Sequence, residues 1–134
     1  MAQPNLPLGV IVTERYTSAR EALADLLRSD GFRAFEADDA TALFAINTNP
    51  DAAVLLMDLD IMNWKTIVDY AQTRIPGIFV IGMHGTDPVP SNLEQCGVSV
   101  CFKKPLMYSA IAGAISAVSP PPVQPAQDFF RRNR

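Results

Sequence analysis

Two aspartates stand directly after an apolar run near the middle of the chain. Asp58 and Asp60 follow residues 54–57 in the stretch VLLMDLDIM. A short apolar run of this kind is typical of a buried strand, which can present a carboxylate at its tip but does not easily hold one inside. An aspartate in that position can act as a nucleophile that accepts a phosphoryl group. Asp58 is the first candidate, because it lies directly at the end of the run.

Phosphoryl transfer to an aspartate also needs positive charge around the phosphoryl oxygens. Magnesium supplies it from a site of carboxylate and carbonyl oxygens and waters, and a lysine can pair with the phosphate. Glu14 follows the apolar run at residues 9–12, and Lys104 follows the run at residues 98–102. If these runs are parallel strands of one sheet, their carboxyl ends meet at one edge, and the three side chains would converge there.

Apolar runs alternate with segments of helical periodicity along the chain. Consecutive apolar strands joined by helices predict an α/β fold, in which a doubly wound, five-stranded parallel sheet is covered on both faces. The predicted strands are residues 9–12, 32–37, 52–57, 78–82 and 98–102, and the predicted helices are residues 18–31, 38–49, 65–74, 91–96 and 106–118.

The first predicted helix carries the clearest local signals. Ser18 with Glu21 has the spacing of a capping box, and Gly31 stands where a helix terminator is expected. Five apolar residues at helical spacing predict one core-facing stripe: Ala19, Ala22, Leu23, Leu26 and Leu27.

Composition places the chain among globular proteins. It has 134 residues, 49% of them hydrophobic and 19% charged, with a formal net charge of −3. This balance gives no sign of a nucleic-acid surface. The two cysteines are too few for a disulfide framework or a zinc site, so we expect reduced thiols. The N-terminus lacks the pattern of a signal peptide, and no apolar run has membrane-spanning length, so we expect a cytoplasmic protein without a membrane partner.

Three segments are expected: an N-terminal extension at residues 1–8, one domain at residues 9–118, and a proline-rich flexible tail at residues 119–134. The tail ends in FFRRNR. These aromatic and basic residues could dock on a partner, or the tail could be a disordered end or the start of a linker. Since no DNA-binding domain follows, we expect no nucleic-acid partner.

Over residues 8–118 the chain resembles the receiver domain of bacterial two-component response regulators. The stretches that carry the resemblance are GVIVTE, PDAAVLLMDLDIM, IPGIFVIGMHG and GVSVCFKKPL. The resemblance implies a flavodoxin-like (βα)5 receiver fold with strand order 2-1-3-4-5. It also implies a cis peptide bond between Lys104 and Pro105.

The resemblance assigns roles to the candidate residues. Asp58 would be the phosphoacceptor, and Lys104 would pair with the phosphate. Glu14, Asp58 and the backbone carbonyl of Asp60 would bind Mg²⁺, and weakly, because the family's paired acids are reduced to Glu14.

Three positions depart from the family pattern and alter the expected switch. Thr13 stands in place of the first acid, Gly82 in place of a hydroxyl residue that bonds the phosphoryl group, and Cys101 in place of a rotating aromatic ring. His84 and Thr86 are the polar residues nearby that could substitute for the lost hydroxyl.

Three classes of function remain. The first is a receiver that signals through protein contacts, with a sensor histidine kinase or phosphotransfer protein upstream, and with a downstream partner or homodimer formed through the fourth helix, fifth strand and fifth helix. The second is a receiver-like binding module that works without phosphate. The third is a DxD-type phosphatase, disfavoured because too few residues follow Asp58 for its remaining acids and cap. No GxGxxG motif supports dinucleotide binding. We expect a signalling domain, not an enzyme.

Overall fold

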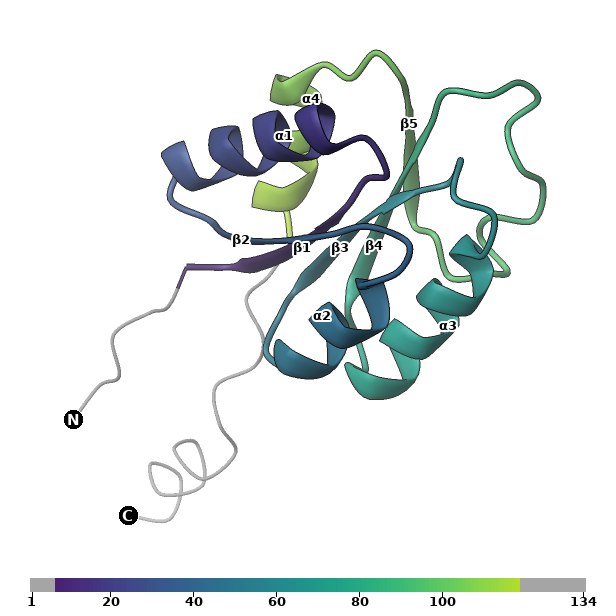
Figure 1. The fold of residues 1–134 in the computed structure, drawn as a ribbon, viewed down its shortest axis with the longest axis horizontal. Helices are drawn as coiled ribbons and strands as arrows, with labels where there is room; N and C mark the ends of the chain where they lie inside the picture. Colours follow the sequence, from purple (N-terminus) through teal and green to yellow (C-terminus); the bar gives the residue numbers. More distant parts are fainter. Residues whose placement is uncertain (1–6, 119–134) are drawn as a thin grey trace.

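The computed structural model describes residues 7–118 and contains one parallel sheet with helices on both faces (Figure 1). The strand order is β2-β1-β3-β4-β5, and every pair of neighbouring strands is parallel. The predicted doubly wound sheet and its order 2-1-3-4-5 are therefore confirmed. The strands are β1 (Gly9–Thr13), β2 (Arg33–Ala37), β3 (Val54–Asp58), β4 (Phe79–His84) and β5 (Val100–Lys103), and the helices are α1 (Thr17–Ser29), α2 (Ala42–Thr48), α3 (Trp64–Arg74) and α4 (Tyr108–Ser116).

The core forms two layers, one on each face of the sheet. Figure 1 shows α1 and α4 over one face, and α2 and α3 over the other. Side chains alternate along each strand, so Val54 and Leu56 pack toward α1 and α4, while Leu55 and Met57 pack toward α2 and α3. This explains why β1 and β3 read as continuous apolar runs: both of their faces are buried.

The helix predicted over residues 91–96 is absent. After β4 the chain runs as a loop whose only compact part is a turn at residues 93–97. Pro88 and Pro90 fix their own backbone and offer no N–H, and Gly97 has a φ of 95°, so little chain remains in which a helix could form. Residues 7–118 therefore contain four helices, and the prediction of a fifth at residues 91–96 is wrong. The partner face expected from a fourth helix, fifth strand and fifth helix retains only β5 and α4.

Helix α1 differs from its prediction at its start and along one side. Its N-cap is Tyr16, with no side-chain capping bond among the described residues, so the predicted capping box at Ser18 and Glu21 is wrong. Gly31 does adopt a positive φ, of 92°, just after the helix. The stripe predicted for the core divides: Leu23 and Leu27 are buried, whereas Ala19, Ala22 and Leu26 are exposed.

Two predicted segments fall largely outside the structure. Most of the N-terminal extension (residues 1–6) and the whole tail (residues 119–134) lie outside the described residues. Between residues 7 and 118, no helix combines the length and the apolar character needed to span a bilayer.

Candidate functional site

The carboxyl edge of the sheet gathers the predicted site residues around Lys104. Its Nζ lies 3.0 Å from Glu14 Oε2, 3.0 Å from Asp58 Oδ1 and 3.3 Å from Asp60 Oδ2. Asp58 ends β3, Glu14 directly follows β1, and Lys104 directly follows β5. The parallel topology thus brings three distant parts of the sequence to one point, as we predicted from their positions at the ends of the apolar runs. The cis peptide bond expected between Lys104 and Pro105 is present.

Asp58 is fully buried, at 0% exposure, and both of its carboxylate oxygens are engaged. Oδ1 accepts hydrogen bonds from Lys104 Nζ and from the Asp60 N–H, at 3.0 and 2.9 Å. Oδ2 accepts a bond from the Arg15 N–H at 3.2 Å. Bonds to a carboxylate are stronger than neutral ones, so they hold this group firmly. The candidate nucleophile therefore has no unoccupied oxygen facing solvent.

Glu14 is almost as deeply buried, at 2% exposure. Its Oε2 pairs with Lys104, and its Oε1 accepts a bond from the Tyr16 N–H at 3.2 Å. Its backbone carbonyl accepts a bond from Arg20 Nη1 at 2.8 Å. These contacts fix the turn from β1 into α1 and aim the carboxylate at the lysine.

Asp60 ties the loop after β4 to the site. Its carboxylate accepts bonds from the N–H groups of Gly85 and Thr86, at 2.9 and 3.2 Å, and it pairs with Lys104. Burial alone would raise the pKa of Asp60, but these donors outweigh it and hold the pKa below 3.8. The backbone carbonyl of Asp60, which the family resemblance assigned to the metal, instead accepts a bond from Arg15 Nη1 at 3.4 Å.

Lys104 stays charged in this surrounding. Burial lowers its pKa, but bonds to Glu14 and Asp58 outweigh that effect, so the pKa lies above the usual 10.5. Gly85 allows the loop to approach the lysine closely. A Cβ at this position would lie 3.1 Å from Asp60 Oδ2 and 3.3 Å from Lys104 Cδ.

Thr13, at the position of the family's first acid, has a structural role. Its hydroxyl donates to the Leu56 carbonyl at 2.8 Å and accepts a bond from the Asp58 N–H at 3.2 Å. The side chain is fully buried between β1 and β3. Thr13 therefore helps to hold Asp58 in place and offers no free ligand to the site.

Gly82 leaves room for a neighbouring leucine. A Cβ on Gly82 would lie 2.7 Å from Leu59 Cδ1 and 3.1 Å from Val98 Cγ1. Leu59, itself buried, therefore fills the space that a hydroxyl-bearing side chain would need. Cys101 pairs with Gly82 across the sheet and packs against the same core cluster. Burial raises the pKa of its thiol, so it is a poor nucleophile at neutral pH.

The two suggested substitutes for the lost hydroxyl, His84 and Thr86, do not take its place beside Asp58. Within residues 7–118, neither His84 nor Thr86 donates a hydrogen bond to that carboxylate from its side chain. Thr86 bonds Asp60 through its backbone. The buried Nδ1 of His84 has no hydrogen-bond partner in the described part of the chain.

Sequence reasoning missed Arg15 and Leu59. The only sequence signal for Arg15 was its place directly after Glu14, and Leu59 gave none, because it looks like any apolar residue beside a strand. Both contribute to the site: Arg15 brings a second cation, and Leu59 fills the position of the lost hydroxyl.

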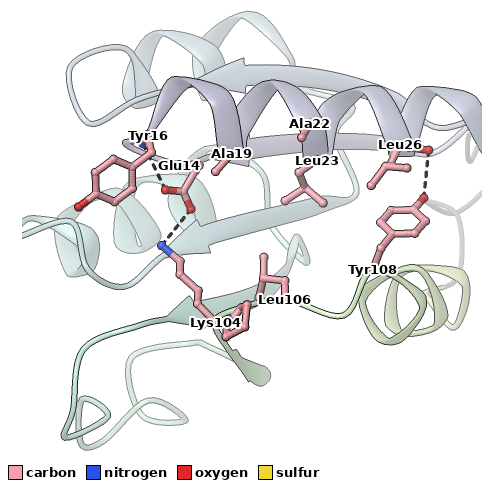
Figure 2. A pocket seen from close by; sticks show the side chains of 10 residues that line it. Glu14, Tyr16, Ala19, Ala22, Leu23, Leu26, Lys104, Leu106 and Tyr108 are labelled. Carbon is pink, nitrogen blue, oxygen red and sulfur yellow. Dashed lines mark hydrogen bonds and ion pairs between the residues drawn. The ribbon is translucent and has the colours of Figure 1, made fainter.

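An open groove of about 330 Å³ lies beside the ion pairs, between α1 and the chain that joins β5 to α4 (Figure 2). The Glu14–Lys104 pair stands at one end and Tyr108 at the other. The Tyr108 hydroxyl bonds Asp30 Oδ2 at 2.7 Å, and burial together with this carboxylate raises the pKa of Tyr108 to about 12. Asp58 is not part of the lining. The walls are mostly apolar, with Ala19, Ala22, Leu23, Leu26 and Leu106 among them.

The oxygen atoms at this site are of the kind that bind magnesium, but they already contact positively charged side chains. Carboxylate and carbonyl oxygens are its usual ligands. Here Lys104 contacts both Glu14 and Asp58, and Arg15 contacts the Asp60 carbonyl, so each implied ligand already faces a cation. Across residues 7–118, no group of three acidic, histidine or cysteine side chains is placed to hold a metal ion. In this arrangement Lys104 and Arg15 occupy the positions beside these oxygens where a metal ion would bind.

Comparisons with known proteins identify the fold. No family model and no curated protein matches the chain. Solved structures do match. A response regulator receiver domain from Methylobacillus flagellatus superposes with a TM-score of 0.72 at 17% identity, over 84% of this chain and 99% of that one. A response regulator from Thermotoga maritima superposes with a TM-score of 0.68 at 16% identity, over 83% of this chain and 96% of that one. A structure from Rhodopirellula baltica described as adenylate cyclase superposes with a TM-score of 0.73 at 20% identity, over 84% of this chain and 87% of that one.

The chain thus has the CheY-like receiver fold of response regulators, which confirms the resemblance seen in the sequence at the level of the fold. These matches cover 83 to 84% of this chain.

Proposed function

We propose that this chain is a receiver-type signalling domain that acts through contacts with partner proteins, and not as an enzyme. The observation that carries the proposal is Lys104, whose ammonium joins Asp58, Glu14 and Asp60 at the carboxyl edge of a receiver-type sheet. This is where ligands and switches lie in sheets of this kind. A cytoplasmic location is part of the same proposal.

The geometry favours signalling that does not depend on phosphate. Asp58 has no exposed surface, and both its oxygens have donors. A phosphoryl group there would also lack the usual hydroxyl partner, because Leu59 fills the space beside Gly82. A hydrogen bond to a charged group contributes roughly 1.5–3 kcal/mol, a factor of about ten to a hundred in an equilibrium. Without that hydrogen bond, phosphorylation would shift the conformational equilibrium of the domain only slightly.

A second candidate, a phosphoacceptor receiver, is favoured by the 3.0 Å pair between Lys104 and Asp58. In this form a sensor histidine kinase or phosphotransfer protein would supply the phosphoryl group to Asp58. Magnesium would have to be held by Glu14, Asp58 and the Asp60 carbonyl. Lys104 and Arg15 would first have to leave these oxygens.

The downstream partner, or a second copy of the chain, would use what remains of the expected partner face. That face consists of β5 and α4, without a preceding helix. Met107, at the N-cap of α4, is 70% exposed and offers an apolar contact there.

Intact-mass measurement after incubation with acetyl phosphate and MgCl₂ distinguishes the two candidates. For phosphate-independent signalling we expect no phosphoryl adduct on the wild type. The phosphoacceptor candidate instead requires an adduct on the wild type and on Asp60→Asn, and none on Asp58→Asn. An adduct that persists in Asp58→Asn would contradict both candidates, because the phosphoryl group would then lie elsewhere.

A further inference from the structure

We infer that Arg15 and Lys104 together provide the positive charge that a divalent cation would otherwise bring, so that the acid site is complete without a metal ion. This goes beyond the proposed signalling role, because it concerns how the site itself is stabilised. It also gives a function to Arg15, which the family pattern does not assign.

The first support is the pairing of charges at the site. Three carboxylates converge there, and all three are largely buried: Glu14, Asp58 and Asp60. Buried carboxylates are stable in the charged form only when they are paired or hydrogen-bonded. Lys104 contacts all three, yet one ammonium leaves two negative charges in excess. Arg15 reduces that excess to one.

The second support is the way Arg15 is held. Its backbone N–H donates to Asp58 Oδ2 at 3.2 Å, which fixes the start of the side chain at the site. Its guanidinium stacks over the Tyr16 ring, 4.8 Å from the ring centroid. The same group donates to the Asp60 carbonyl at 3.4 Å. Although the side chain is exposed, its two contacts and the backbone bond to Asp58 direct it to the oxygen that a metal would need.

An added Mg²⁺ would therefore meet two cations already in place. It binds its ligands at about 2.1 Å, closer than either side chain approaches the same oxygens. A Mg²⁺ ion bound to these oxygens would therefore lie close to the Lys104 ammonium and the Arg15 guanidinium, and like charges this close repel strongly in a partly buried site. Removing the charge of Arg15 should therefore raise the affinity for Mg²⁺ by roughly tenfold or more.

The test is a titration with MgCl₂, followed by calorimetry and by thermal unfolding, of the wild type, Arg15→Gln and Arg74→Gln. Arg74 is the matched control, because it also stacks on a tyrosine, Tyr70, at 5.6 Å, and lies at the far end of α3. We expect the wild type and Arg74→Gln to unfold at the same temperature in EDTA and in MgCl₂. Arg15→Gln should bind Mg²⁺ at least about tenfold more tightly and become more stable when it is added.

A further variant, Arg15→Lys, shows whether the charge of the Arg15 side chain or its shape determines the affinity for Mg²⁺. It keeps the charge and should resemble the wild type in its response to Mg²⁺. The inference is overturned if the wild type binds Mg²⁺ as tightly as Arg15→Gln, or if Arg15→Lys gains the same affinity as Arg15→Gln. These readouts involve no partner protein, so they stand or fall separately from the proposed signalling role.

Discussion

Replacing Lys104 with methionine should lower the free energy of unfolding by about 3 kcal/mol. Methionine keeps much of the aliphatic length but leaves Glu14, Asp58 and Asp60 without their shared ammonium. Breaking a buried ion pair costs about 3–5 kcal/mol, and the lower end applies because the Lys104 side chain is 20% exposed. Denaturant unfolding followed by the fluorescence of Trp64, the one tryptophan of the chain and a core residue, measures the loss.

The neighbouring lysine is the control for this variant. Lys103 is 63% exposed, and among the described residues it pairs only with Asp87, also exposed, at 3.6 Å. Surface pairs contribute about 0–1 kcal/mol, so Lys103→Met should change stability by less than that. The double variant Lys104→Met/Asp58→Asn should recover part of the loss, since one unpaired buried charge is removed. Equal losses in the two lysine variants would show that the ion pairs do not hold the site together.

Placing the family's hydroxyl at position 82 should destabilise the domain instead of restoring a switch. The Cβ of Gly82→Ser would lie 2.7 Å from Leu59 Cδ1, so the leucine must move within a packed core. Overpacking of this kind costs about 1–3 kcal/mol. The same unfolding measurement gives the change, and adding Leu59→Ala to Gly82→Ser should cost less than the two single losses combined.

Gly113→Ser is the matched control for this substitution. Gly113 lies in α4, and a Cβ there would have no other described atom within 4 Å. Serine has a higher helix propensity than glycine, so stability should stay the same or rise slightly. If Gly82→Ser is as stable as the wild type, Leu59 does not block the position.

The sequence predicted most of the fold because β1 and β3 are buried on both faces, which leaves continuous apolar runs. It failed where local pattern and tertiary position differ. Residues 91–96 resemble a short helix, but the prolines before them and Gly97 after them leave a turn. Leu26 has core spacing but lies in the open groove, because the sheet and α4 cover only part of that side of α1.

The candidate site divides in the same way. Asp58, Glu14 and Lys104 could be predicted because parallel topology alone brings strand ends together. The Arg15 guanidinium and the Leu59 side chain could not, since their positions depend on side-chain rotamers and on the pairing of β3 with β4. The hydroxyl of Thr13 could equally have faced the site or the sheet, and only its bond to the Leu56 carbonyl shows which.

The most direct measurement is the affinity of a partner protein, obtained by co-purification with the full chain, for the wild type and for Asp58→Asn. A site stabilised by its own lysine and arginine predicts that the two dissociation constants differ by less than about tenfold, because Asp58 chemistry does not select between conformations. Lys104 would keep its pairs with Glu14 and Asp60 in the variant. A difference of about a hundredfold would contradict this, since partner binding would then follow the state of Asp58.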